Sequence, residues 1–367
     1  MREDMHILIS GGGTGGHIFP AIAIANEIKR RHPKAEILFV GASDKMEMQK
    51  VPAAGYPIEG LWISGLKRSL DLSNLMFPVK LISSWFRSGK IVRRFKPDLA
   101  IGTGGFASGP ALNAAIRHGV PALIQEQNSY PGITNKILGR KAKRICVAYD
   151  EMGKFFPQQK IVKTGNPVRH NIVQCNIRTE KARTEFELDT DDKVILVVGG
   201  SLGSRTLNHC MIGGLDHFRE AGIKVIWQTG AGMYDMCRNA AKGYENIRVH
   251  DFIGNIDHAY AAADIIISRA GAIAISELCI VGKPVILVPF PFAAEDHQTK
   301  NAYALVKNDA ALMISDKEAP VQLLPAAIYL MQDEMKRKTL AEHIRAFAIP
   351  DATERIVDEA MQLLESN

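Results

Sequence analysis

The chain contains two series of short apolar runs, and each series opens with an apolar run, a glycine-rich turn and a helix-length segment. The first opens at residues 7–17 (ILISGGGTGGH) and the second at residues 195–204 (ILVVGGSLGS). Continuous apolar runs separated by helix-length segments are typical of parallel strands that helices cover on both faces. The repeated pattern therefore predicts an α/β chain with two tandem Rossmann-like, doubly wound domains.

Ten apolar runs are long enough to be buried strands. They lie at residues 6–10, 36–41, 98–102, 121–125, 144–149, 193–199, 224–230, 247–252, 263–268 and 283–290. We expect an N-terminal domain of residues 1–167, onto which a helix in residues 350–367 packs back, and a C-terminal domain of residues 168–349. Ligands of such sheets bind beyond the carboxyl ends of the strands, so we expect the two domains to face a ligand cleft.

Positive charge is concentrated in the first half of the chain. Residues 1–170 carry 25 Lys and Arg against 12 Asp and Glu, whereas residues 171–367 carry 20 against 27. This asymmetry indicates that the first half meets an anion, such as a phospholipid surface, a nucleic acid or a phosphorylated substrate. Solvated charge without a partner is the alternative. No RNA- or DNA-binding motif accompanies the charge, so we expect no nucleic acid.

Composition disfavours several classes of protein. The five cysteines are scattered without a CxxC pair, which argues against a disulfide framework or a zinc site and fits a reducing compartment. The N-terminal segment MREDMHILIS does not have the pattern of a signal peptide, and no apolar stretch approaches the ~18 residues that cross a bilayer. Because the chain has no His, Cys, Asp and Glu cluster with metal-ligand spacing, we expect no metal and no cofactor.

The first glycine turn, Gly11–Gly16, follows a strand and precedes a helix that we expect to begin near Pro20. Glycines let backbone N–H groups approach an anion, and a helix N-terminus adds a favourable dipole. The turn formally matches GxGxxG, the dinucleotide fingerprint. The next strand, however, lacks an acidic residue at its tip, and Asp44 sits late. We therefore expect this turn to bind phosphate rather than a nicotinamide dinucleotide.

His17 ends this turn and is the predicted catalytic base. An imidazole that is neutral near pH 7 can accept a proton from a sugar hydroxyl, and the turn is expected to direct His17 into the cleft. A histidine that only caps the helix is the alternative. Glu126 is a second candidate that either assists or replaces His17.

A second glycine turn, residues 102–110 (GTGGFASGP), follows another predicted strand. Two such turns in one domain can hold two phosphates or one diphosphate, for which Gly13, Gly104 and Gly105 are the candidates. Tight packing of helix on strand is the alternative. The polar run 125–128 (QEQN) ends the next strand and is expected to include ligand-binding side chains, unless it is a solvated loop.

The second domain repeats this arrangement. Its turn at residues 199–204 offers backbone N–H groups and the Ser201 hydroxyl at a helix start. Residues 268–277 (SRAGAIAISE) again predict a strand, a turn and a helix, with Glu277 either on two ribose hydroxyls or at the surface. Gln298 and Asn301 lie three residues apart and share a helix face, where they hold sugar hydroxyls or face water.

Residues 62–96 mix aromatic and aliphatic side chains with cations. The cations include Lys67, Arg68, Lys80, Arg87, Lys90, Arg93 and Arg94, and the apolar members include Leu75, Met76, Trp85 and Phe86. This mixture suits contact with an anionic bilayer surface. A core helix with a solvated basic face is the alternative.

Taken together, these motifs resemble the MurG family of glycosyltransferases. The matching segments are GGGTGGHIFPAIAIA (11–25), GTGGFASGPALNAA (102–115), QEQNSYPGITNK (125–136), TGNPVR (164–169), VVGGSLGSRTLN (197–208), SRAGAIAISELCIVGKP (268–284) and IPDATERIVDE (349–359). The resemblance covers essentially the whole chain. It implies the two-domain GT-B fold, with the acceptor in the N-terminal domain and the nucleotide-sugar in the C-terminal domain.

The resemblance also implies which residues contact UDP-N-acetylglucosamine (UDP-GlcNAc). They are Thr14, Gly15, Gly16, Asn128, Arg169, Ser201, Ile253, Ala272, Ile273, Ala274, Ile275, Ser276, Glu277 and Gln298. Ile253 would lie against uracil, Glu277 on the ribose hydroxyls and Gln298 near the donor sugar. The family often has two adjacent glutamines where this chain has His297 and Gln298.

The reaction implied by the resemblance is an inverting transfer in peptidoglycan synthesis. GlcNAc would move from UDP to the 4-hydroxyl of undecaprenyl-pyrophosphoryl-MurNAc-pentapeptide (lipid I) to give lipid II. The resemblance further implies a peripheral protein on the cytoplasmic face of the inner membrane, with proteins of a cell-wall synthesis complex as partners. The alternatives are another GT-B transferase or an epimerase that uses a UDP-sugar, and a nucleotide-binding regulatory module without turnover.

Overall fold

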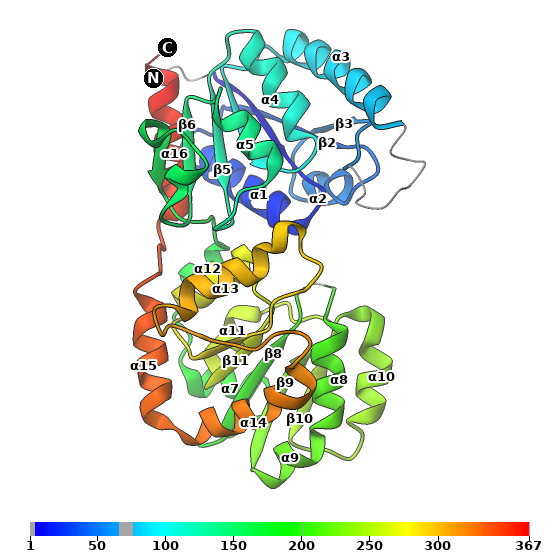
Figure 1. Ribbon diagram of the computed structural model, residues 1–367, viewed down its shortest axis with the longest axis vertical. Coiled ribbons are helices and arrows are strands. Elements are labelled where there is room, and N and C mark those ends of the chain that lie inside the picture. The colour runs from blue at the N-terminus through cyan, green and yellow to red at the C-terminus, as the bar shows by residue number, and fades with distance from the viewer. Residues whose placement is uncertain (1–3, 66–75, 201, 367) are drawn as a thin grey trace. The chain divides into compact units, whose positions relative to one another are not determined.

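The computed structural model describes residues 4–65, 76–200 and 202–366 and divides into two compact units (Figure 1). Unit 1 comprises Met1–Val168 together with Asp351–Asn367, and unit 2 comprises Arg169–Pro350. Among the described residues, each unit is built on one parallel β-sheet with helices on both faces.

The sheet of unit 1 has seven described strands in the order β3-β2-β1-β4-β5-β6-β7. The strands are β1 (His6–Gly11), β2 (Glu36–Ala42), β3 (Ile58–Leu61), β4 (Leu99–Gly104), β5 (Ala122–Glu126), β6 (Arg144–Val147) and β7 (Ile161–Lys163). The helices are α1 (Gly15–Arg31), α2 (Glu47–Ala53), α3 (Phe77–Phe95), α4 (Ser108–Arg117), α5 (Ile133–Gly139), α16 (Ala352–Glu365) and the short 3₁₀ turns η2 (Met152–Lys154) and η3 (Gln158–Lys160).

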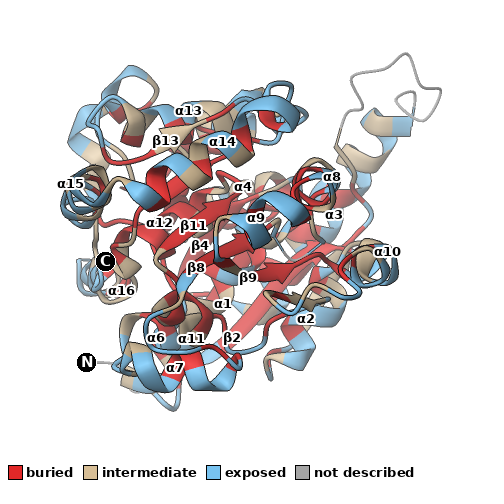
Figure 2. Cartoon of the chain, turned by 90° about the horizontal axis from the view of Figure 1, so that it is seen from below, coloured by how far each residue is buried: buried red, intermediate tan, exposed pale blue. Residues whose placement is uncertain are grey.

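Two apolar layers cover this sheet because successive strand residues point to opposite faces. Ile7 and Ile9 of β1 pack with α1, α2 and α16, whereas Leu8 between them packs with α3, α4 and α5. The final helix joins the first layer through Ile356 and Val357, both buried. Burial on both faces explains why these strands are continuous apolar runs, and Figure 2 shows the strands buried beneath helices with exposed outer sides.

Unit 2 repeats the order with a six-stranded sheet, β10-β9-β8-β11-β12-β13. The strands are β8 (Lys193–Val198), β9 (Ile223–Gln228), β10 (Ile247–His250), β11 (Ile265–Ser268), β12 (Val285–Leu287) and β13 (Leu312–Met313). The helices are α6 (His170–Val173), α7 (Thr179–Glu185), α8 (Arg205–Gly213), α9 (Leu215–Glu220), α10 (Tyr234–Ala240), α11 (Ile256–Ala262), α12 (Ala272–Val281), α13 (His297–Val306), α14 (Ala319–Gln332) and α15 (Glu334–Arg345), with 3₁₀ turns η4 (Ala231–Met233) and η5 (Ala294–Asp296). Both sheets reverse strand order beside their first strand, the position where doubly wound sheets bind ligands.

Each of the ten predicted strands overlaps an observed strand, and the sequence analysis missed three: β3, β7 and β13. All three lie at sheet edges. They are short, and they leave most of their residues partly exposed, so they lack the continuous apolar runs of the central strands.

The start of the first helix was predicted wrongly. α1 begins at Gly15 rather than near Pro20, because the N–H groups of His17 and Ile18 both bond to the Thr14 carbonyl, at 3.1 and 3.2 Å. Pro20 is accommodated inside the helix near its first turn. His17 consequently lies on a helix, and its side-chain direction is set by regular backbone geometry rather than by a loop.

No helix among the described residues is long and apolar enough to cross a membrane. Within the same residues, no group of three or more His, Cys, Asp or Glu side chains is arranged to hold a metal ion.

Candidate functional site

The first glycine turn of unit 1 rests on a buried carboxylate that the sequence analysis missed. Glu47, the first residue of α2, is fully buried. Its Oε1 and Oε2 accept the Gly13 N–H at 3.2 and 3.0 Å, and Oε1 also accepts the Ala42 N–H at 3.0 Å. A Cβ added at Gly12 would lie 2.1 Å from Glu47 Oε1. Gly12 is therefore needed for the turn to close over this carboxylate.

The two glycine turns of unit 1 pack directly against each other. The Gly12 N–H donates to the Gly104 carbonyl at 3.3 Å, and a Cβ on Gly105 would lie 2.2 Å from the Gly12 oxygen. A Cβ on Gly104 would lie 2.9 Å from the His17 ring, and both Gly104 and Gly105 have positive φ. The close approach of the two turns therefore requires glycine at positions 104 and 105.

His17 is half-buried in the first turn of α1 and is held from two sides. Its ring Nδ1 lies 3.1 Å from Oε1 of Gln127, and its backbone carbonyl accepts the Thr103 hydroxyl at 2.7 Å. Thr14, Gly15 and Gly16 precede it on the same turn, so the structure brings these four predicted residues together. The Nε2 edge of the ring is the part of His17 that Gln127 does not engage.

Three residues of the polar run at the end of β5, Gln125, Glu126 and Gln127, are buried and Asn128 is half-buried, so their interpretation as a solvated loop is wrong. The Glu126 carboxylate accepts four hydrogen bonds: from the Asn128 N–H and Nδ2, the Gly132 N–H and Asn135 Nδ2, at 2.9–3.2 Å. These four donors tie the carboxylate to the segment that follows it. Glu126 thus positions Asn128, which is predicted to contact the sugar donor UDP-GlcNAc.

The glycine turn of unit 2 contains two glycines in the left-handed region of the backbone. Gly200 and Gly203 have positive φ, and a Cβ on Gly203 would lie 1.9 Å from the Thr229 carbonyl oxygen. Ser204 caps α8, because its hydroxyl accepts the Leu207 N–H at 3.3 Å. Ser201, predicted to bind the diphosphate, lies outside the described residues.

Gln228, at the end of β9, connects this turn to Ile253 and was not predicted. Its Nε2 donates to the Gly200 carbonyl at 3.1 Å, and its Oε1 accepts the Ile253 N–H at 3.0 Å. Ile253 is 5% exposed, so it presents little surface to a base in this structure. One buried amide therefore fixes both the turn predicted to bind an anion and the segment predicted to contact uracil.

The turn between β11 and α12 is fixed by two side chains. Arg269 is buried and donates to the Val288 and Pro289 carbonyls, each at 3.1 Å, and to Asp316 at 2.5 Å. Gln298 Oε1 accepts the Ala270 N–H at 3.2 Å and the Phe290 N–H at 2.9 Å. The Gln298 amide nitrogen is then the part of this side chain that can donate to a sugar.

Glu277 is buried on α12, so its interpretation as a surface glutamate is wrong. Its carboxylate accepts two hydrogen bonds from Arg169, from Nε at 2.8 Å and Nη2 at 2.9 Å. The Tyr260 hydroxyl also bonds to Glu277, and burial together with this carboxylate raises the pKa of Tyr260. The two charged residues predicted to contact the nucleotide are thus paired with each other within unit 2.

The other residues predicted on α12 and α13 differ in accessibility. Ala272 and Ile275 are buried, whereas Ile273, Ala274 and Ser276 are half-buried. Asn301 is fully buried, so its interpretation as a water-facing residue is wrong. Gly271, Ile273 and Ala274 leave the start of α12 partly accessible, and a helix start offers backbone N–H groups.

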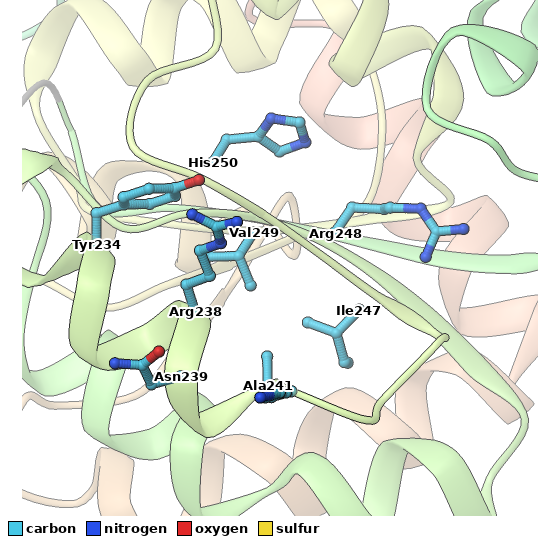
Figure 3. Close-up of a pocket in the computed structure, with 9 residues that line it drawn as sticks. Tyr234, Arg238, Asn239, Ala241, Ile247, Arg248, Val249 and His250 are labelled. Carbon is cyan, nitrogen blue, oxygen red and sulfur yellow. The ribbon is translucent and has the colours of Figure 1, made fainter.

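A cavity of about 490 Å³ in unit 2 lies apart from these turns (Figure 3). It is lined by residues of α10 and of the edge strand β10, including Tyr234, Arg238, Val249 and His250. None of the predicted site residues lines it.

Models of both domains of glycosyltransferase family 28 match the chain, the N-terminal domain over residues 7–147 and the C-terminal domain over residues 194–356. A UDP-N-acetylglucosamine–N-acetylmuramyl-(pentapeptide) pyrophosphoryl-undecaprenol N-acetylglucosamine transferase from Cytophaga hutchinsonii is 56% identical over 366 residues, 100% of this chain and 99% of the relative. The crystal structure of Acinetobacter baumannii MurG is similar at TM-score 0.80 and 28% identity, covering 98% of this chain and 99% of that one. The chain belongs to the MurG family of glycosyltransferases.

Membership of the MurG family confirms the predicted family, the GT-B fold class and the enzyme class. A protein of the same name from Parabacteroides distasonis is 54% identical over 98% of each chain. A UDP-GlcNAc 2-epimerase from Neisseria meningitidis is also similar in structure, with a TM-score of 0.68 at 15% identity over 98% of this chain. That likeness shows the fold alone, and the identity to the MurG family decides between transferase and epimerase.

Proposed function

We propose that this protein transfers GlcNAc from UDP-GlcNAc to the 4-hydroxyl of lipid I and releases UDP. The observation that carries the proposal is identity of 50–56% along the whole chain to proteins named for this reaction. The match spans both units, so it includes the residues of both glycine turns as well as those that define the fold.

We place the donor on unit 2. The diphosphate is bound by N–H groups at the starts of α8 and α12, where helix dipoles and amides neutralise negative charge. The segment of Ile253 contacts the base, Glu277 the ribose hydroxyls and the Gln298 amide nitrogen the sugar, whereas Asn301, which is fully buried, is assigned no direct contact. Arg169, which already pairs with Glu277, supplies a cation for the diphosphate.

We assign the catalytic base to His17. The acceptor oxygen forms its bond to the anomeric carbon as the bond from that carbon to the UDP oxygen breaks, which inverts the configuration. The hydroxyl proton passes to Nε2 of His17, the ring edge that Gln127 leaves open. Glu126 is the weaker candidate, because all four of its hydrogen bonds bind it to its own loop.

The acceptor diphosphate is assigned to the paired turns that contain Gly13, Gly104 and Gly105. The Gly13 N–H already donates to Glu47. The other N–H groups of these two turns are therefore the proposed donors to this anion, whereas Thr14, Gly15 and Gly16 at the start of α1 keep the predicted contact with UDP-GlcNAc.

The proposed membrane surface is the outer side of α3. Val79, Ile82 and Phe86 are exposed on it, beside the exposed cations Arg87 and Lys90. Its inner side packs on the sheet through Ser84, Ser88, Ile91 and Val92. Lys67, Arg68 and Leu75 of the predicted stretch lie outside the described residues. An apolar strip flanked by cations fits a peripheral position on an anionic leaflet, and we propose the cytoplasmic face of the inner membrane, with cell-wall synthesis proteins as partners.

UDP release with a short-chain lipid I analogue tests the reaction. We expect release from UDP-GlcNAc only when the acceptor is present, and a disaccharide product of equal amount. The controls are UDP-GlcNAc without acceptor and UDP-glucose with acceptor. Conversion of UDP-GlcNAc to another UDP-sugar without acceptor would instead identify an epimerase, and release with an unrelated acceptor would identify a different transferase.

A further inference from the structure

A network of buried amides lies behind His17 in unit 1. Gln125 and Gln127 come from the end of β5 and the residue after it, and Asn166 from the segment after β7. All three are at most 2% exposed. Buried amides must pair each N–H with an acceptor and each oxygen with a donor, so the partners of this network fix how each amide is oriented.

Backbone carbonyls set the orientation of two of these amides. Asn166 Nδ2 donates to the Gln127 carbonyl at 3.0 Å, and Gln127 Nε2 donates to the Thr103 carbonyl at 2.8 Å. A carbonyl oxygen can only accept. The amide nitrogens of Asn166 and Gln127 must therefore face these carbonyls, and their oxygens must face the other way.

The side-chain contacts agree with that orientation. Asn166 Oδ1 accepts from Gln125 Nε2 at 2.9 Å, and Gln125 Oε1 accepts from Gln127 Nε2. The only atom of Gln127 left to face the histidine is Oε1, which lies 3.1 Å from His17 Nδ1. Because an amide oxygen cannot donate, Nδ1 must carry the hydrogen.

We infer that Gln127, oriented by Thr103, Gln125 and Asn166, holds neutral His17 in the tautomer with its proton on Nδ1. Neutral imidazole has one ring proton, so Nε2 is left as a bare acceptor. Resting on the proposed function, this makes Gln127 a positioning residue for the base. The opposite tautomer would present an N–H to the sugar hydroxyl and could not accept its proton.

The His17 ring also lies close against the second glycine turn. Gly104 has no Cβ, and one placed there would meet Cε1 and Nδ1 of His17 at 2.9 Å, so the ring fits closely against this residue. The Thr103 hydroxyl bonds to the His17 carbonyl at 2.7 Å and fixes the helix turn that carries the ring. The amide oxygen beside Nδ1 therefore selects the tautomer by hydrogen bonding, without the charge of a carboxylate.

Nitrogen NMR on the full chain tests the tautomer without any assay of turnover. In protein labelled with ¹⁵N-histidine, two-bond ¹H–¹⁵N correlations at a pH where the ring is neutral distinguish the protonated from the bare nitrogen. The His17 signals are those that disappear in His17→Ala. We expect the proton on Nδ1 in the unmodified protein. A proton on Nε2 would overturn the inference, and this first measurement needs no Gln127 variant to fold.

Two Gln127 variants extend the test. Gln127→Met removes the acceptor and should move a substantial fraction of His17 to the Nε2–H form, while Gln127→Glu keeps an oxygen beside Nδ1 and should retain Nδ1–H. Unshifted signals from the remaining histidines report an intact fold, and Gln362→Met on the exposed side of α16 is the matched control. An unchanged tautomer in folded Gln127→Met would contradict the inference.

Kinetics separates this inference from the assignment of the base. Gln127→Met should lower kcat at least about tenfold but by no more than His17→Ala does, with KM for UDP-GlcNAc unchanged. Gln127→Glu should recover part of the lost kcat. The double variant should be no slower than His17→Ala, because Gln127 acts through His17. Full activity of His17→Ala would refute the base, while the NMR result would still decide the tautomer. Additive losses in the double variant would refute the positioning role.

Discussion

Arg169 and Glu277 form a two-pronged ion pair inside unit 2, with Nε–Oε1 and Nη2–Oε2 distances of 2.8 and 2.9 Å. The two partners differ in exposure, because the Arg169 side chain is 46% exposed and that of Glu277 only 5%. The carboxylate therefore depends on the guanidinium more than the guanidinium depends on it. In the proposed complex Glu277 would bind ribose while keeping this contact.

This asymmetry predicts unequal effects of the two substitutions on stability. Arg169→Ala leaves a buried carboxylate short of donors and should lower the free energy of unfolding by about 1–3 kcal/mol. Glu277→Gln keeps an oxygen in place and should lower the free energy of unfolding less. It should also weaken UDP binding, because the charged carboxylate that accepts the ribose hydroxyls is lost. Urea denaturation and calorimetric titration with UDP measure the two effects. Equal stability losses would contradict the proposed dependence of Glu277 on Arg169.

His17→Ala should reduce kcat by about 10²–10⁴-fold, the range expected for loss of a general base. UDP affinity should change little, since the proposed nucleotide contacts lie on unit 2 and His17 on unit 1. Steady-state kinetics and UDP titration provide the readouts. His118→Ala, at an exposed histidine of the same unit, is the control and should keep full turnover. If His17→Ala also kept it, Glu126 would be tested next.

Glu47 is expected to stabilise the first glycine turn. Glu47→Ala leaves the N–H groups of Gly13 and Ala42 without their acceptor, and should lower the free energy of unfolding by about 1–3 kcal/mol. Glu47→Gln retains one acceptor oxygen and should cost less. Chemical denaturation gives both values, and kcat/KM should fall with the disordering of the turn. Wild-type stability of Glu47→Ala would show that water replaces the carboxylate.

The outer side of α3 is expected to bind anionic vesicles. Replacing Arg87 and Lys90 by serine should weaken partitioning by about 2 kcal/mol, on the order of 30-fold, because each cation near the surface contributes about 1 kcal/mol. Sedimentation with phosphatidylglycerol vesicles measures it. The matched control, Arg238→Ser with Lys242→Ser on unit 2, should leave binding unchanged. Equal losses in both pairs would indicate nonspecific charge attraction.

Glu27 is expected to make the free energy of unfolding depend on pH in the acid range. Its hydrogen bond from Arg30, followed by contacts with Arg31, lowers the pKa of Glu27. A carboxyl with a lowered folded pKa stabilises the fold above its unfolded pKa of about 4.3, and that contribution disappears as pH falls through the folded pKa. Between about pH 5 and pH 2, Glu27→Gln should therefore lose less stability than the unmodified protein. Urea titrations across this range test it, with Glu365→Gln at an exposed site as the control.

Several features were predictable from sequence because they are local. The central strands were visible as apolar runs, since burial on both faces demands them, and the glycine turns stood out by composition. The start of α1 was not predictable by these rules. Proline is common in the first turn of helices, so Pro20 suggested a start near residue 20, whereas hydrogen bonds to the Thr14 carbonyl begin the helix at Gly15.

The sequence by itself determined the fold class, the family and the polar residues at the strand ends. Only the tertiary structure decided how those residues are paired. Glu47 and Gly13 are 34 residues apart, His17 and Gln127 are 110 apart, and Arg169 and Glu277 are 108 apart. Strand order in a parallel sheet brings such distant positions together, and nothing in the local propensity of either partner specifies which carboxylate or amide will face it.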